Sequence, residues 1–290
     1  MEENKTFVSA LDMRKALDAF GIEKDSILIT HSSLKACGQI ENGPYGVIEA
    51  LEATVPDGTL VFPTLSQKNF RNAFEDWHLD RPSDVGLISE TFRKQEGSLR
   101  SDNPTHSVAA RGRDAADLVG GPANEGARHG IYGDFGFGHY SPWQKMYESR
   151  TLYGVKAYVL FWGCTMTHLT FKHLIEYMFV EEMLAKIKNP ALLAEVSKTL
   201  ATFPTSGAEL FTDKTKHWPF YASEEFANEV LIPEGIAKVV PLGDNFLYCA
   251  DVFALVERTR EILFSDPYRF IYTCMHPWIE KLLAAIEAGN

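Results

Sequence analysis

The clearest chemical signal in the sequence is a histidine and a glutamate three positions apart, His173 and Glu176. In an α-helix this spacing leaves two side chains roughly 60° apart, so the imidazole and the carboxylate would face the same way. A carboxylate beside an imidazole fixes its tautomer and raises its basicity, which suits a general base. The alternative is an ordinary i,i+3 surface pair.

A second candidate site is the polar segment that follows the apolar run 26–31. Its hydroxyls, backbone N–H groups and one cation suit a phosphate or pyrophosphate. Ligands of open parallel sheets bind at the carboxyl ends of strands. The segment contains neither a Walker A motif nor G-x-G-x-x-G, so a structural loop is the alternative. Its candidate residues are Ser32, Ser33, Leu34, Lys35 and Ala36.

A third candidate joins a turn to a short strand and places a histidine beside two hydroxyls. Its residues are Pro104, Thr105, His106, Ser107 and Val108. A buried structural histidine is the alternative interpretation of His106.

Cys164 is a fourth candidate, because a thiol at a strand-to-helix turn gains thiolate character from the helix N-terminus. With His173 as base and Glu176 as its partner, it would make the protein a cysteine hydrolase or amidase. A small buried side chain is the alternative. No G-x-S-x-G is present, which disfavours a serine hydrolase.

His168 and His173 lie about 140° apart on a helix, so no metal site is predicted.

An alternation of strands and helices must position these residues. The strand–helix–strand order over 26–62 predicts a βαβ unit. No linker separates two halves, so we predict one α/β domain over 1–290, with a mainly parallel central sheet flanked by helices. The segments 66–82 and 120–138 are predicted loops, and the seven glycines of the second favour a mobile loop or lid. Predicted strands cover 26–31, 59–62, 107–110, 156–162 and the surroundings of Val239 and Phe246, and predicted helices cover 9–20, 44–55, 85–95, 142–148, 167–178, 251–264 and 277–288.

Composition excludes several classes of protein. Hydrophobic residues make up 45% of the chain and charged residues 23%, so a disordered chain is excluded. The formal net charge of −11 disfavours nucleic-acid binding. No apolar run is long enough to span a membrane, and the polar N-terminus is unlike a signal peptide. Four scattered cysteines without C-x-x-C predict free thiols in a cytoplasmic protein.

Taken in order, these segments resemble the aminoglycoside 3-N-acetyltransferase family, also called the antibiotic N-acetyltransferase family, which is distinct from the GNAT fold. The resemblance covers about residues 10–260 and leaves out the C-terminal segment 266–290. Segments 31–38 and 100–108 together are the most specific part. The motifs are HSSLKACG at 31–38, GTLVFPT at 58–64, RPSDVG at 81–86, RSDNPTHSV at 100–108, SP at 141–142, HLIEY at 173–177 and, weakly, GDNFL at 243–247.

The resemblance implies acetyl transfer from acetyl-CoA to an amine, with acetyl-CoA as co-substrate and no metal. It places the segments like 32–36 and 104–108 on the pyrophosphate and pantetheine arm, with Thr64 and Ser66 lining the pantetheine channel. It places His173 and Glu176 at the acetyl-accepting centre, with His31 as a second candidate catalytic imidazole. Direct transfer is expected, with loop N–H groups and hydroxyls near Ser32 or Ser107 as donors to the oxyanion.

The acceptor is less well defined than the donor. His168, Phe171 and Lys172 replace smaller or more neutral residues of the family, and the stretch 200–233 matches no acceptor pattern. Four acidic residues form either an acidic wall for a polycationic aminoglycoside or a solvated loop; they are Glu75, Asp76, Asp80 and Asp84. An amino sugar of surface polysaccharide is an alternative acceptor. A CoA-binding protein without activity is a further alternative, and a homodimer is left open.

Overall fold

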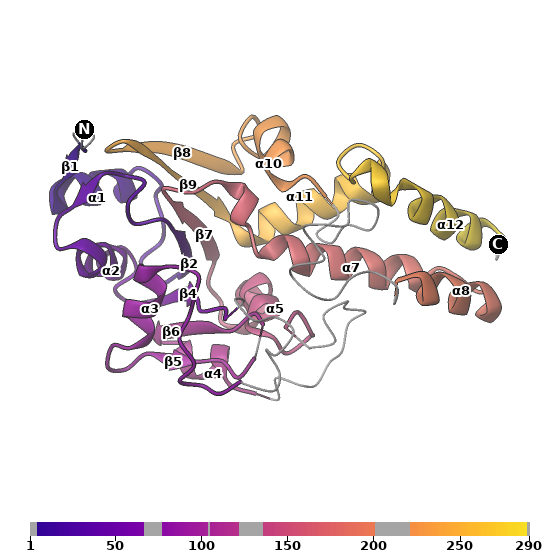
Figure 1. The fold of residues 1–290 in the computed structure, drawn as a ribbon, viewed down its shortest axis with the longest axis horizontal. Helices are drawn as coiled ribbons and strands as arrows, with labels where there is room; N and C mark the ends of the chain where they lie inside the picture. Colours follow the sequence, from indigo (N-terminus) through magenta and orange to yellow (C-terminus); the bar gives the residue numbers. More distant parts are fainter. Residues whose placement is uncertain (1–4, 67–76, 104, 122–135, 201–220, 289–290) are drawn as a thin grey trace.

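The apolar runs of the sequence become the inner strands of a seven-stranded sheet. The computed structural model describes residues 5–66, 77–103, 105–121, 136–200 and 221–288 (Figure 1). The strand order is β5-β6-β4-β2-β7-β9-β8, and a separate small sheet pairs β1 with β3. The strands are β1 Phe7–Val8, β2 Ile27–Ser32, β3 Gln39–Ile40, β4 Thr59–Pro63, β5 Leu99–Arg100, β6 Val108–Gly112, β7 Ala157–Trp162, β8 Ala237–Leu242 and β9 Asn245–Asp251.

Helices cover both faces of the sheet. Asp12 and Ser9 form a capping box at the start of α1, and the Ser141 hydroxyl accepts the Gln144 N–H at the start of α5. The helices are α1 Ala10–Asp18, α2 Gly43–Thr54, α3 Leu87–Arg93, α4 Ala115–Val119, α5 Pro142–Tyr147, α6 Ser149–Leu152, α7 Phe171–Ala185, α8 Pro190–Leu200, α10 Ser223–Phe226, α11 Val252–Ser265 and α12 His276–Glu287. Short 3-10 turns precede α7 at Met166–His168 and α12 at Thr273–Met275, and a π-helical turn spans Ala227–Leu231.

The prediction of a mainly parallel sheet is inexact. The βαβ unit is confirmed, because β2 pairs in parallel with both β4 and β7. The outer pairs are antiparallel: β4 with β6, β5 with β6, β7 with β9 and β8 with β9. Alternating side chains do not distinguish the direction of a half-buried strand, so the sequence pattern of 107–110 carried no sign of its reversal.

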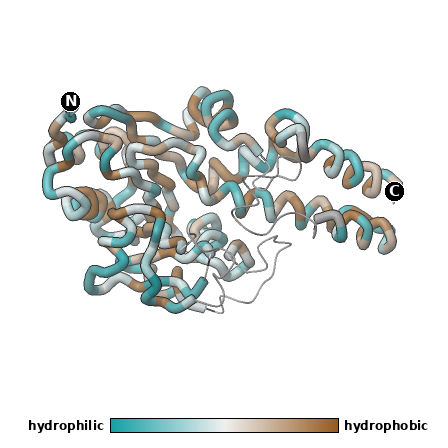
Figure 2. Tube along the Cα trace, viewed as in Figure 1, coloured by the Kyte–Doolittle hydropathy of each residue, from teal (hydrophilic) through white to brown (hydrophobic). Residues whose placement is uncertain are grey.

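Two hydrophobic cores occupy opposite faces of the sheet. One, here the α7 core, packs α5, α7, α11 and α12 against residues such as Ile29 and Phe161. The other, the α2 core, packs α1, α2 and α3 against residues such as Leu28 and Phe62. Figure 2 shows hydrophobic and hydrophilic residues alternating along these helices, as expected for helices with one buried face.

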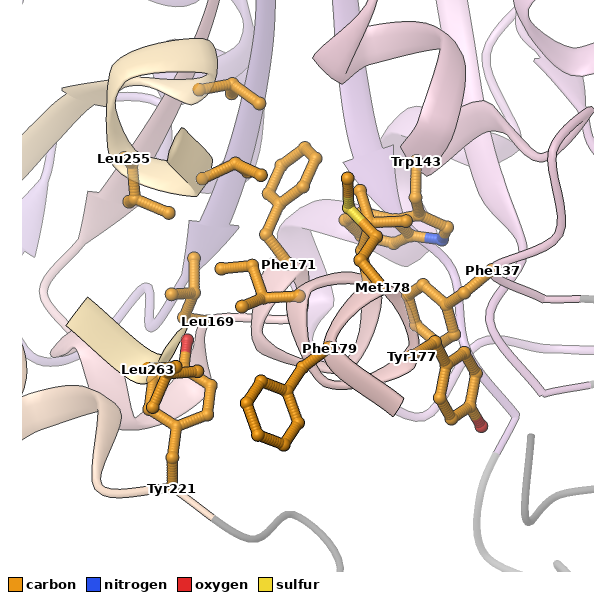
Figure 3. Close-up of a cluster of buried hydrophobic side chains, with 14 of the residues drawn as sticks. Phe137, Trp143, Leu169, Phe171, Tyr177, Met178, Phe179, Tyr221, Leu255 and Leu263 are labelled. Atoms are coloured by element: carbon orange, nitrogen blue, oxygen red, sulfur yellow. The ribbon is translucent and has the colours of Figure 1, made fainter. Parts of the chain in front are cut away.

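Helix α7 is the main element of its core. Ten of its fifteen residues are buried, and Figure 3 shows Phe171, Tyr177 and Phe179 of this helix among Trp143, Phe137 and Leu263. It begins later than the predicted start at 167, because 166–168 form a 3-10 turn. The sequence pattern also missed α8, which packs beside α12 and extends with it away from the sheet (Figure 1).

Candidate active site

Helix α7 carries His173 and Glu176 on one face, with His173 Nδ1 3.1 Å from Glu176 Oε2. The Glu176 side chain is fully buried, whereas the His173 side chain is 13% exposed. The other carboxylate oxygen accepts the Tyr221 backbone N–H at 3.4 Å. A carboxylate facing Nδ1 favours the tautomer with the proton on Nδ1, which leaves Nε2 as the basic nitrogen.

His106 lies next to His173, with ring centroids 5.5 Å apart in an edge-on arrangement. The Asn103 side-chain oxygen accepts the backbone N–H groups of Thr105 at 3.1 Å and His106 at 2.7 Å. The Thr105 hydroxyl lies 3.2 Å from the same oxygen and 2.8 Å from His106 Nδ1. The Trp143 indole N–H donates to the His106 carbonyl at 2.9 Å. This turn therefore fixes the orientation of the His106 ring.

The Phe137 ring packs against both histidine rings. Its ring centroid lies 4.6 Å from that of His106, 5.6 Å from that of His173 and 5.3 Å from that of Tyr177. Sequence reasoning missed Phe137 because it lies among glycines and shares no periodicity with an element. The term histidine cluster is used below for Asn103, Thr105, His106, Phe137, His173 and Glu176.

The imidazoles of this cluster are held in their neutral form. Burial lowers the pKa of His106 well below the usual value, and the neighbouring His173 adds to this effect. Burial likewise lowers the pKa of His173, and the Lys172 ammonium lowers it further. A neutral imidazole carries a lone pair on one of its two ring nitrogens.

His31 lies on the α7 side of the sheet, at the carboxyl end of β2. Its ring stacks on Phe161 at 5.2 Å and faces Trp143 at 6.4 Å. Burial lowers the pKa of His31 to about 3, with smaller contributions from His168 and Lys172. Its Nε2 atom is buried and has no hydrogen-bond partner among the described residues. His31 is therefore neutral at neutral pH, as are His106 and His173.

The loop after β2 is accessible to a ligand. Ser33 and Lys35 are exposed, and Ser32 is partly buried with a hydroxyl that has no partner among the described residues. The Ser33 N–H donates to the Trp162 carbonyl at 2.8 Å, which ties the loop to β7. Gly163 has φ +64°, and a Cβ there would lie 2.9 Å from Ala36 Cβ, so glycine lets the loop pack closely on the strand end.

A second polar cluster surrounds Arg100, a residue that sequence reasoning did not select. Arg100 Nε lies 3.2 Å from both Thr64 Oγ1 and Ser107 Oγ, and Nη2 lies 3.3 Å from Ser66 Oγ. Thr64 and Ser107 are fully buried and Ser66 is 3% exposed. The hydroxyls of these three residues thus lie buried around the Arg100 guanidinium. Arg100, Thr64, Ser66 and Ser107 are called the arginine cluster below.

The remaining candidates are not gathered at either cluster. Asp80 is exposed, and Asp84 is partly buried with its N–H on the Leu65 carbonyl at 3.0 Å. Glu75, Asp76, Pro104 and most of the Gly-rich segment lie outside the described residues.

Within the described ranges, no group of three metal-ligating side chains occurs and no helix is long and apolar enough to cross a membrane.

Cys164 has the environment of a structural thiol. Burial raises its pKa to about 12, and the neighbouring Cys37 acts in the same direction. A nucleophilic cysteine needs a lowered pKa, so this environment counts against the hydrolase interpretation.

The fold and the site define an α/β protein with a mixed sheet and a histidine whose ring is oriented by a buried carboxylate. The chain belongs to the aminoglycoside 3-N-acetyltransferase family, a family of acyltransferases, whose family model matches residues 29–263.

Two curated relatives illustrate the similarity. Aminoglycoside N(3)-acetyltransferase III of Pseudomonas aeruginosa is 30% identical over 181 residues, which cover 56% of this chain and 61% of the relative. This chain thus spans less than two thirds of that relative. The aminoglycoside N(3')-acetyltransferase-like protein YokD of Bacillus subtilis (strain 168) is 27% identical over 243 residues, covering 76% of this chain and 77% of YokD.

Solved structures share the fold. The apoenzyme of aminoglycoside acetyltransferase AAC(3)-IVa has a TM-score of 0.65 at 20% identity, covering 97% of this chain and 99% of that one. A complex of an AAC(3)-IVa mutant with a gentamicin has a TM-score of 0.65 at 19% identity, covering 99% of both chains. AAC-IIIb in a binary complex with CoASH has a TM-score of 0.61 at 20% identity, covering 90% and 97%.

Proposed function

We propose that the protein transfers the acetyl group of acetyl-CoA to an amine of an aminoglycoside, at the 3-N position, by direct transfer. The observation that carries this proposal is the neutral, carboxylate-oriented imidazole of His173 in a chain of this family. The relatives' names and the gentamicin and CoASH complexes of structural neighbours support the choice of acceptor and donor.

The proton of the acceptor is the first requirement of the mechanism. An ammonium ion has no lone pair, so the acceptor amine must be deprotonated before it attacks. His173 Nε2 accepts that proton, and Glu176 stabilises the resulting imidazolium through Nδ1 at 3.1 Å. The 13% exposure of His173 provides access to a substrate, whereas the fully buried Glu176 acts only through the histidine.

The acetyl group then moves from sulfur to nitrogen. The amine forms a C–N bond with the thioester carbonyl, the tetrahedral oxyanion collapses, and the C–S bond breaks with release of the CoA thiolate. The new amide nitrogen loses its second proton to water, and the imidazolium of His173 returns the first proton to the thiolate, so one proton is released overall and the step balances. The Ser32 hydroxyl is the proposed oxyanion donor, because it has no partner among the described residues, whereas the Ser107 hydroxyl donates to the Thr64 carbonyl at 3.0 Å.

Donor binding is proposed at the loop Ser32–Ala36, where Ser33 and Lys35 are exposed and the Ser32 hydroxyl has no partner among the described residues. The net charge of −11 favours a polycationic acceptor. An amino sugar of surface polysaccharide is the alternative acceptor with the same chemistry. A cytoplasmic location is part of the proposal, because acetyl-CoA is available there.

A thiol-release assay tests the function. Wild-type protein and acetyl-CoA are mixed with gentamicin, apramycin, a simple amino sugar or no amine, and the product is identified by mass spectrometry. Release of CoA with an acetylated aminoglycoside is expected. No release with any amine would refute acetyl transfer, and release only with the amino sugar would favour the alternative acceptor.

Cys164→Ala separates direct transfer from a cysteine mechanism. The variant is expected to keep most of the wild-type rate, because an activated thioester needs no acyl-enzyme. An inactive variant, together with a stable acetyl adduct on Cys164 of the wild type, would favour the covalent mechanism.

A further inference from the structure

The guanidinium of Arg100 is directed at protein acceptors on every side. Nε faces the hydroxyls of Thr64 and Ser107, and Nη2 faces the Thr64 carbonyl and the Ser66 hydroxyl. Nη1 faces the carbonyls of Leu79, at 2.7 Å, and Arg81. An arginine has five N–H donors. The three nitrogens thus use this donor set within the protein and leave none for a ligand phosphate.

These contacts join chain segments that are distant in sequence. Arg100 links the extension of β4 at Thr64 and Ser66 to the segment 77–84, here called the strap. Trp77 lies over the guanidinium, which is 4.7 Å from the ring centroid, and its indole N–H donates to Asp102 at 2.6 Å. The Ser66 hydroxyl donates to the Pro82 carbonyl at 2.9 Å. Removing the guanidinium would therefore loosen the strap and the strand end together.

The positive charge of Arg100 is not balanced by a direct ion pair. Among the described residues, no carboxylate oxygen lies within 4.0 Å of it, although Glu90 and Asp80 act on it from farther away. Burial lowers the pKa of Arg100 to about 10, so it stays charged at neutral pH. An incompletely compensated cation at the carboxyl end of a sheet favours an anionic ligand nearby.

We propose that Arg100 is a positioning residue for the anionic acyl donor. Its guanidinium holds the strap and the hydroxyls at the end of β4 in place, and its positive charge attracts the donor without touching it. The inference rests on the proposed function, because the donor it concerns is acetyl-CoA. Arg100 touches no reacting atom in this assignment, so its loss affects donor binding and leaves the proton transfer at His173 in place.

Arg111 provides a matched control. It lies on β6, its guanidinium is 4.8 Å from the Phe92 ring centroid, and it donates to Gln95 at 2.9 Å. Unlike Arg100, it has a direct carboxylate partner, Glu52. Lysine at either position keeps the charge and loses the planar fork.

The test compares Arg100→Lys, Arg100→Met and Arg111→Lys by steady-state kinetics and by calorimetric titration with acetyl-CoA. We expect Arg100→Lys to raise the KM for acetyl-CoA by about tenfold while kcat stays within about threefold, the pattern of lost binding without lost chemistry. Arg100→Met should raise KM further, because it also removes the charge. Arg111→Lys should stay within about twofold of the wild type.

Hydrogen exchange of the strap gives a readout independent of turnover. Faster exchange of residues 77–84 in Arg100→Lys than in Arg111→Lys is expected. An unchanged KM in Arg100→Lys, or equal losses in kcat from the two lysine variants, would overturn the inference.

A second variant covers the case in which Arg100 substitutions do not fold. Thr64→Val is isosteric and removes one acceptor of Arg100, so a KM increase of a few fold with unchanged kcat is expected, and an unchanged KM would overturn the inference. The wild-type titration separates the two proposals. Wild type that fails to bind acetyl-CoA refutes the proposed function, whereas wild type and Arg100→Lys that bind it equally refute only the role of Arg100.

Discussion

The histidine cluster and the arginine cluster lie on opposite faces of the same end of the sheet. His106 and Ser107 are consecutive, yet the first packs against Phe137 of the α7 core and the second contacts Thr64 and Arg100. Beyond them, Val108 belongs to the α7 core and Ala109 to the α2 core. Alternation along one extended segment thus separates two kinds of polar site by a single residue.

The two clusters use burial in different ways. Burial lowers the pKa of His106 and His173, so that neutral bases are available. Burial also lowers the pKa of Arg100, but only to about 10, and the group stays charged. One face therefore holds neutral imidazoles, and the other holds a fixed charge in a hydrogen-bond network. The first is suited to chemistry on the acceptor and the second to placement of the donor.

His173→Ala gives the largest expected effect and would separate the faces functionally. Removing a general base lowers kcat by about 10²- to 10⁴-fold, whereas acetyl-CoA affinity should stay within about twofold. This is the reverse of the pattern expected for Arg100→Lys. Steady-state rates and calorimetric titration measure both quantities, and a rate within a few fold of the wild type would make His173 a structural residue.

His31→Phe tests the cost of a buried neutral imidazole. Because the folded pKa of His31 is about 3 and the unfolded pKa is about 6.5, the unfolded state binds one more proton between these values. His31 therefore lowers the free energy of unfolding by about 1.4 kcal/mol for each pH unit below 6.5. Phenylalanine, stacked on Phe161, should remove this part of the slope.

Urea titrations between pH 6.5 and pH 5 measure that difference. The free energy of unfolding of His31→Phe at pH 7.5 should equal or exceed that of the wild type, because an unpartnered Nε2 is removed. Identical slopes for both proteins would show that His31 titrates normally in the folded state.

Lys172→Met gives the smallest expected effect. It tests how a neighbouring charge contributes to the pKa of His173 in the histidine cluster. Burial is the main cause of the lowered pKa of His173 and the Lys172 ammonium lowers it further, so removal of the ammonium should raise that pKa. NMR titration of the imidazole resonances measures the shift. A shift in the opposite direction would contradict the charge argument.

Sequence periodicity was sufficient for several elements and for the contact between His173 and Glu176. The βαβ unit, the helix that starts at 142 and the strands near Val239 and Phe246 follow from local patterns, and they are confirmed. The spacing of His173 and Glu176 required only that α7 be a helix, and the structure places the pair in contact. Their catalytic role stays a prediction.

Other features depend on tertiary contacts that leave no local signal. Arg100 is a charged residue before a loop, and such residues are usually expected at the surface. Its burial depends on acceptors from 64–66, 79–81 and 107. Phe137 enters the histidine cluster from a glycine-rich stretch without periodicity. The sequence also gives no sign that the Thr64 hydroxyl lies 3.2 Å from Arg100 Nε, and its place in the pantetheine channel stays a prediction.

The pairing of β2 with β7 has a consequence for folding of the new chain. These strands match in register over six residues, from Ile27 with Ala157 to Ser32 with Trp162. The partners are separated by about 130 residues, and closing so long a loop is slow because its entropy is lost before the contacts form. During synthesis, β2 must wait for β7 to leave the ribosome. The edge of β2 that pairs with β7 stays unpaired for that interval, and chaperone binding or aggregation would compete with folding there.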